Sequence, residues 1–222
     1  MKESWEYNKL LKSYQFWEYL SFFADKVLIF QSDSLLLKKN NDNDRNKNLN
    51  IRDFMQYDFI GSPWHLAANA GSNLWLRRMQ RHGVLKEGVG NGGLSLRDVH
   101  AMLKITSQFG CDIPTYPIVQ ECINNSSYVS THANKEITHQ RKSDNSNEDV
   151  FFVTHAEKMG GFQLPNRTMA YRFAQEGMCD DLHQGDLDTD KSIIPLGIHG
   201  AWNYFPSEWM SKLFEFSLVF PP

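Results

Sequence analysis

The clearest pattern in this chain is an apolar run over residues 26–31 that ends in a small polar cluster, Gln31-Ser32-Asp33-Ser34. Its β-branched and aromatic residues are typical of a buried strand. Residues 8–22 carry apolar side chains at helical spacing, which predicts an amphipathic helix running directly into that strand. Asp33 should therefore lie where a strand leaves the sheet, at the edge where α/β proteins gather their ligands.

Helices and strands interleave along the rest of the chain, which predicts an α/β fold. In order, we expect a helix at 51–57, strands at 58–60 and 94–97, helices at 98–109 and 148–160, a short helix from 165, a strand at 193–199 and a helix from 207. Two polar inserts, 38–50 and 123–147, lack apolar periodicity and are expected to be disordered surface loops. Residues 65–87 fit a flexible lid or a basic helix, and the arginines favour the helix.

Composition bounds the class of protein. With 222 residues, 41% of them hydrophobic, the chain has enough apolar material for one globular domain over 1–222. The net charge of −3 provides no basic face for nucleic acid. No apolar stretch approaches the ~20 residues that span a bilayer. The N-terminus lacks a signal-peptide pattern, so we expect a cytoplasmic protein. The three cysteines fit no zinc pattern and are expected to be thiols, with a Cys111–Cys122 bridge left open.

Two polar features following the strand pattern are candidate ligand-binding elements. Asp33 can hold a hard divalent cation, which prefers oxygen ligands, or it can cap a turn after the strand. The glycine-rich turn Asn91-Gly92-Gly93 lets a ligand approach the backbone closely, and the Asn91 amide both donates and accepts, as sugar hydroxyls require. A simple tight turn explains the same glycines.

Two further groups are candidates for catalysis. Glu148 and Asp149 open a predicted helix, where the helix dipole favours carboxylates without any functional role. Alternatively, burial of one carboxylate near the other raises its pKa and makes it a general base. His199 lies in an apolar segment and is a structural residue unless it meets Asp33 in space, in which case oxygen and imidazole ligation suits manganese.

The order of these motifs resembles the glycosyltransferase-like domain family of large DNA viruses and microbes, which looks like a branch of the GT-A nucleotide-sugar glycosyltransferases. The resemblance covers about residues 8–205, apart from the two inserts. The segments that carry it are VLIFQSDS at 27–34, YDFIGSPW at 57–64, VGNGGLSLR at 89–97, EDVFF at 148–152, LP at 164–165 and PLGIH at 195–199.

The resemblance implies a GT-A-like mixed sheet flanked by helices and a role for each motif. The D-x-D motif of GT-A enzymes corresponds to Gln31-Ser32-Asp33, with Asp33 a direct ligand of Mn²⁺ (or Mg²⁺). The amide of Gln31 would bind the ribose or a metal-bound water, and His199 would complete the metal site. The turn Asn91-Gly92-Gly93 would line the donor-sugar pocket, and Trp64 would stack against a sugar ring. Asp149, with Glu148 second, would deprotonate the acceptor.

The expected function is therefore metal-dependent, inverting transfer of a sugar from a nucleotide-sugar donor to a glycan or other hydroxyl acceptor. GT-A domains begin with a unit that holds the nucleoside base, and this chain starts at the helix before the metal-binding strand, so we expect that unit to be missing or shortened. Two alternatives remain: a non-catalytic glycan- or nucleotide-binding remnant, and a metal-dependent hydrolase using Asp33, Glu148 and Asp149.

Overall fold

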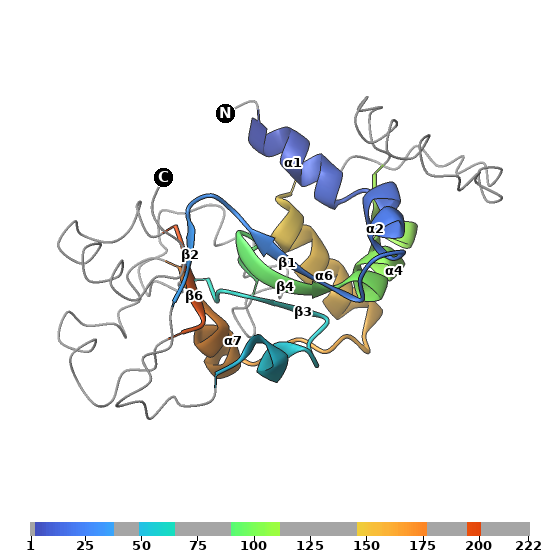
Figure 1. The fold of residues 1–222 in the computed structure, drawn as a ribbon. Coiled ribbons are helices and arrows are strands. Elements are labelled where there is room, and N and C mark those ends of the chain that lie inside the picture. The colour runs from blue at the N-terminus through green and yellow to red at the C-terminus, as the bar shows by residue number, and fades with distance from the viewer. Residues whose placement is uncertain (1–2, 38–48, 65–89, 112–145, 177–194, 201–222) are drawn as a thin grey trace, which may run out of the picture.

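A computed structural model of the chain describes residues 3–37, 49–64, 90–111, 146–176 and 195–200 (Figure 1). Within these ranges, helices and short strands interleave along the chain, and the strands form two small sheets. The mixed α/β class expected from the pattern is confirmed at this level. The helix expected from residue 207 and the stretch 65–87 lie outside the described residues, as do 38–48 and 123–145 of the polar inserts.

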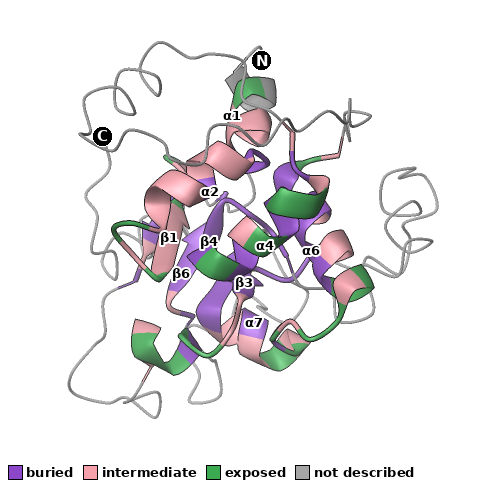
Figure 2. Cartoon of the chain, turned by 90° about the vertical axis from the view of Figure 1, so that its right-hand side faces the viewer, coloured by how far each residue is buried: buried purple, intermediate pink, exposed green. Residues whose placement is uncertain are grey.

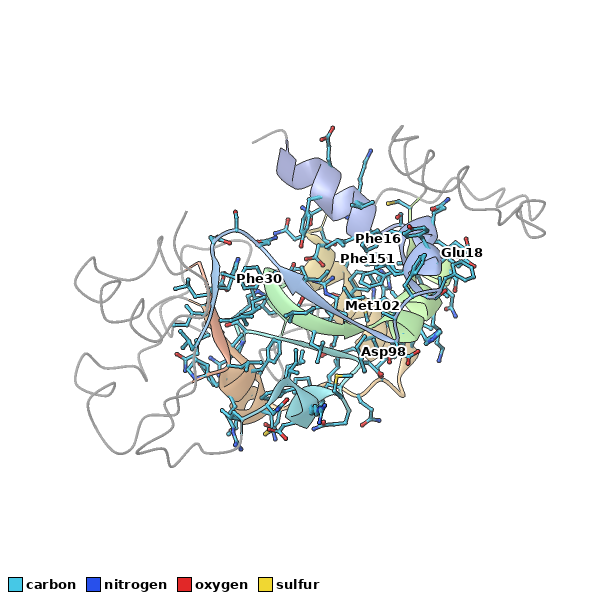
Figure 3. All side chains as sticks on the ribbon, in the orientation of Figure 1. Phe16, Glu18, Phe30, Asp98, Met102 and Phe151 are labelled. Atoms are coloured by element: carbon cyan, nitrogen blue, oxygen red, sulfur yellow. The ribbon has the colours of Figure 1, made fainter. Side chains whose placement is uncertain are left out.

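The first sheet has the strand order β1-β4-β3, comprising β1 (Lys26–Phe30), β4 (Leu94–Asp98) and β3 (Phe59–Gly61). The central strand β4 is antiparallel to both neighbours. Phe30 pairs with Leu94 at one end, and Lys26 pairs with Asp98 at the other, where the Lys26 Nζ lies 3.1 Å from the Asp98 carboxylate. Phe30 and Asp98 therefore mark opposite ends of the sheet (Figure 3).

The second sheet has the order β2-β6-β5, comprising β2 (Ser34–Leu36), β6 (Gly197–His199) and β5 (Ala174–Glu176). Strand β6 is antiparallel to β2 and parallel to β5. The turn at 31–33 leads from β1 directly into β2, so it joins the two sheets. This is the position predicted for Asp33, where a strand leaves its sheet.

Alternation along the strands of the first sheet divides their side chains between two cores. One face packs on α1 (Glu3–Leu11), α2 (Tyr14–Leu20), α4 (Val99–Phe109) and α6 (Glu148–Met159). Phe16, Met102 and Phe151, from α2, α4 and α6, belong to this core (Figure 3). The other face packs on the 3₁₀ helix at Ile51–Phe54 and on α7 (Arg167–Phe173). Burial on both faces makes β3 and most of β4 appear fully covered (Figure 2).

The helix expected over 8–22 is wrong as a single element, because two helices, α1 and α2, meet at Ser13. Ser13 is extended, and its hydroxyl accepts a hydrogen bond from the backbone N–H of Phe16, so it caps the second helix. The break turns the buried indole of Trp17 back on the first helix, where its N–H donates to the Leu11 carbonyl. The apolar spacing was continuous, but the cap divides it.

The helix expected at 98–109 is confirmed, with Asp98 as its N-cap and Gly110 as its C-cap. The helix expected at 148–160 is confirmed as α6. The short helix expected from residue 165 begins at Arg167, after Asn166 as N-cap. None of the helices in the described part of the chain is long and apolar enough to cross a bilayer.

Candidate functional site

The candidate site lies where the first sheet meets the second, at the Phe30 end of β1. Four segments come together there: the turn after β1, the turn before β4, the first turn of α6 and the end of β6. The backbone N–H of Gln31 donates to the Gly93 carbonyl at 2.9 Å, and the N–H of Gly200 donates to the Asp33 carbonyl at 3.0 Å. These bonds connect the turn after β1 both to the glycine turn and to the strand that carries His199.

The imidazole of His199 meets the turn after β1. Its Nε2 lies 3.1 Å from the Gln31 Oε1 and 3.3 Å from the Asp33 Oδ1. Gln31 and His199 are 168 positions apart in the sequence, so only the fold brings them together. The His199 side chain is 11% exposed and that of Asp33 is 35% exposed, so the ring is covered while the carboxylate reaches solvent. Ser32, between the two turn residues, is exposed.

The other ring nitrogen of His199 faces Glu176, a residue that the sequence did not single out. The Nδ1 lies 3.2 Å from the Glu176 Oε1. Burial lowers the pKa of His199, but the hydrogen bond and charge of Glu176, with the charges of Asp33 and Asp149, outweigh burial and raise it. Because Asp33 and Glu176 approach opposite edges of the ring, they do not surround one point with it. Within the described ranges, no three His, Cys, Asp or Glu side chains are grouped around a single cation position.

The turn Asn91-Gly92-Gly93 fits tightly between these groups and α6. The Asn91 Oδ1 accepts from the Gly93 N–H at 2.9 Å, and its Nδ2 donates to the Glu176 Oε1 at 2.7 Å. A Cβ added at Gly92 would collide with the Glu148 carboxylate, and one added at Gly93 would collide with the His199 Nε2. The glycines are therefore required by the close approach of the Glu148 and His199 side chains to the backbone.

Glu148 is held by a buried arginine, Arg97 on β4. Two guanidinium nitrogens of Arg97 donate to the two Glu148 oxygens, one of them at 3.0 Å, and the same guanidinium donates to the Gly92 carbonyl at 3.3 Å. The Arg97 side chain has no solvent exposure, and its guanidinium lies over the rings of Phe59 and Phe152. Both oxygens of Glu148 are thus engaged by a buried, positively charged guanidinium.

Asp149 is buried in the first turn of α6, with 9% of its surface exposed. Burial, and then the negative charge of Glu148, raise its pKa to about 7. The N–H groups of Val150 and Gly92 donate to its two oxygens, at 2.7 and 3.3 Å. Its carboxylate therefore lies against the glycine turn and can exchange a proton near neutral pH.

Two aromatic residues border the site. Trp64 is buried in the main core, and its six-membered ring packs against Gly90 at the start of the glycine turn. Its expected stacking on a sugar stays a prediction. Tyr7 on α1 interacts electrostatically with the site. Burial, and then the negative charge of Glu148, raise the pKa of its phenol.

The sequence pattern did not single out two side chains that make several contacts in the candidate site, Arg97 and Glu176. The alternation of Leu94-Ser95-Leu96-Arg97 gave no signal for the first, because it places Arg97 with Ser95 on the polar face of the strand, opposite the two leucines. In the structure both faces of β4 are covered, so Arg97 is buried and its charge requires a partner. No local pattern distinguishes Glu176 from the other acidic residues of the chain. Its importance follows only from the pairing of β5 with β6.

The fold and site describe an α/β protein in which buried carboxylates, a histidine and a glycine turn meet at the junction of two sheets. A family model described as "Protein of unknown function (DUF5672)" matches residues 1–199, so the chain belongs to that family. Neither the curated proteins nor the solved structures gave a significant match.

Proposed function

We propose that this protein is a metal-dependent glycosyltransferase with a GT-A-like core that transfers a sugar from a nucleotide donor to a hydroxyl acceptor. The observation that carries the proposal is the meeting of Gln31, Asp33 and His199, residues from opposite ends of the described chain. The sequence pattern gave His199 a functional role only if its ring met Asp33 in space. A structural role for His199 alone would require no carboxylate beside it.

The separations around His199 suit a bound divalent cation. Ligand atoms about 2.1 Å from an octahedral cation lie about 3.0 Å apart when they are adjacent. The Nε2 of His199 is 3.1 Å from the Gln31 oxygen and 3.3 Å from the Asp33 oxygen. One nitrogen and two oxygens form a mixed ligand set that suits Mn²⁺ better than Ca²⁺. Because Asp33 is partly exposed, a diphosphate can reach a cation held there.

The cation would neutralise the charge that develops on the nucleoside diphosphate as the glycosidic bond breaks. This chain's own contribution is to hold the donor sugar and to remove a proton from the acceptor. The glycine turn provides a surface on which a sugar can approach the backbone, with Asn91 at its edge. Asp149 lies against that turn, where it accepts from the Gly92 N–H, and its pKa of about 7 suits a general base at neutral pH.

The test is sugar transfer with purified protein, screened over nucleotide sugars with and without Mn²⁺. A donor that binds only the folded state raises its melting temperature, so a thermal-shift screen identifies the donor before transfer is measured. We expect Asp33→Ala to lower the affinity for Mn²⁺ by at least about tenfold, as loss of a ligand does, and to abolish transfer. The control is Asp25→Ala, whose side chain is 90% exposed and lies outside the site.

The outcomes separate the alternatives. Binding of a nucleotide sugar without transfer or hydrolysis would indicate a binding remnant. Metal-dependent cleavage of a sugar or phosphate ester without a nucleotide donor would indicate a hydrolase. Unchanged Mn²⁺ affinity in Asp33→Ala would refute the proposed cation site.

A further inference from the structure

We propose that Glu176 is a positioning residue that orients His199 toward the cation and Asn91 toward the donor sugar. This inference rests on the proposed function, because it assigns Glu176 a task within that site. Glu176 itself would touch neither the cation nor the substrate. The same carboxylate oxygen, Oε1, contacts both His199 and Asn91, so Glu176 connects the proposed metal site with the proposed sugar site.

The backbone fixes Glu176 beside His199. Strands β5 and β6 are parallel, and Glu176 pairs with His199 at the last position of their register. Side chains of paired residues project to the same face of a sheet, so their contact follows from the strand pairing. The Glu176 side chain is 19% exposed, and that of His199 is 11% exposed. A largely covered carboxylate needs hydrogen-bond donors, and these two neighbours provide them.

The contact with Glu176 decides which nitrogen of His199 can bind a cation. A carboxylate accepts and cannot donate, so the 3.2 Å contact between the Nδ1 of His199 and Oε1 is a hydrogen bond in the Nδ1–H form of the ring, the form that Glu176 favours. In the neutral ring, Nε2 then keeps its lone pair. That lone pair faces the oxygens of Gln31 and Asp33, which are themselves acceptors. A cation bound between Nε2 and these two oxygens would be coordinated by all three lone pairs, which otherwise repel one another.

The contact with Asn91 fixes the orientation of the amide in the glycine turn. The Asn91 Oδ1 accepts from the Gly93 N–H, and its Nδ2 donates to Glu176 at 2.7 Å. The amide is thus held at both ends, and its two groups cannot exchange places without losing both bonds. Removing Glu176 would release the Nδ2 end and loosen the turn that borders His199.

The first test measures binding of Mn²⁺ alone, by titration calorimetry, to the full chain and its variants. Loss of a carboxylate that orients a metal-binding histidine typically costs about 10- to 100-fold in metal affinity, and we expect Glu176→Ala to fall in that range. Glu176→Gln keeps an acceptor oxygen and should recover a large part of the loss. The matched control is Glu6→Ala, because Glu6 is exposed on α1 and should leave the affinity unchanged.

The second test needs no metal. Nitrogen-15 NMR of the histidine rings at alkaline pH reports which nitrogen of His199 carries the hydrogen, with His199→Gln used to assign the signal. We expect the Nδ1–H form in the unchanged protein and in Glu176→Gln. In Glu176→Ala the population should move toward the Nε2–H form, which is the more stable form of a free histidine ring. A purely structural role for Glu176 would lower the melting temperature and leave this distribution unchanged.

The outcomes distinguish this inference from the function on which it rests. If the unchanged protein binds no Mn²⁺, the proposed metal site fails, and the NMR measurement still decides whether Glu176 orients the ring. If the unchanged protein binds Mn²⁺ and Glu176→Ala binds it equally well, the positioning role is overturned and the metal site stands. An Nε2–H ring in the unchanged protein would also overturn it.

Discussion

Replacing Asp149 by asparagine removes a carboxyl group that the folded protein makes difficult to ionise. In the structure its pKa is about 7, against an ordinary value of 3.8, because it is buried beside the negative charge of Glu148. A group whose folded pKa is raised contributes stability that is present at low pH and is lost as pH rises through the folded value. The unchanged protein should therefore lose stability between about pH 4 and pH 7, whereas an asparagine has no proton to lose.

The size of the effect follows from the two pKa values. A separation of about 3 pH units corresponds to about 4 kcal/mol at pH values above both. The N–H groups of Val150 and Gly92 donate to different oxygens of Asp149, and asparagine replaces one of these oxygens by an NH2 group, so one of the two N–H groups loses its acceptor. One unmet hydrogen bond costs about 1–2 kcal/mol at every pH. At about pH 8 the variant should thus be more stable than the unchanged protein by about 2 kcal/mol.

Urea denaturation of both proteins at several pH values measures this directly. Between about pH 5 and pH 8, the free energy of unfolding of the variant should rise relative to the unchanged protein by about 3 kcal/mol. Asp25→Asn is the control, because Asp25 is highly exposed and the substitution should change stability by less than about 0.5 kcal/mol. A difference that does not vary with pH would refute the assignment of a raised pKa to Asp149.

The same variant tests function. A general base contributes about 10²- to 10⁴-fold to a rate, so Asp149→Asn should reduce transfer by that factor while donor binding changes far less. A variant that is more stable at neutral pH and yet inactive would show that the buried carboxylate is kept for chemistry. Equal loss of donor binding and transfer would place Asp149 in the donor site instead.

Two further substitutions test the supports of the site. Arg97→Met leaves Glu148 buried without its partner and should reduce the free energy of unfolding, measured by urea denaturation, by about 3–5 kcal/mol. Arg52→Met, at an exposed arginine, is the control. A loss below about 1 kcal/mol in Arg97→Met would contradict the role of the ion pair. Gly93→Ala forces a methyl group into the Nε2 side of His199 and should displace the ring. Calorimetry should then show weaker Mn²⁺ binding, and unchanged affinity would place the cation elsewhere.

Local signals in the sequence were sufficient for the elements around the site. The apolar run before Gln31 formed β1, because its side chains alternate between two cores. The α4 helix began within one residue of its predicted start at Asp98, because the Asp98 carboxylate accepts from the Ala101 N–H three residues on and caps the helix. Where a capping residue interrupted the apolar spacing, the spacing alone predicted one helix and the structure has two. Ser13 divided a continuous helical pattern, because capping satisfies backbone groups that apolar spacing does not represent.

The sequence by itself determined which residue types were available for chemistry: a carboxylate after a strand, an asparagine in a glycine turn and two acids at a helix start. Only the tertiary structure decided which of them meet. Asp33 reaches His199 because β2 and β6 pair, and Glu176 reaches the same ring because β5 pairs with β6 from the other side. Strand pairing joins residues without regard to their separation along the chain, so no local pattern could indicate these contacts. Likewise, contact with Arg97 distinguishes two adjacent buried acids. Both oxygens of Glu148 accept from the guanidinium, whereas burial and the charge of Glu148 raise the pKa of Asp149 to about 7.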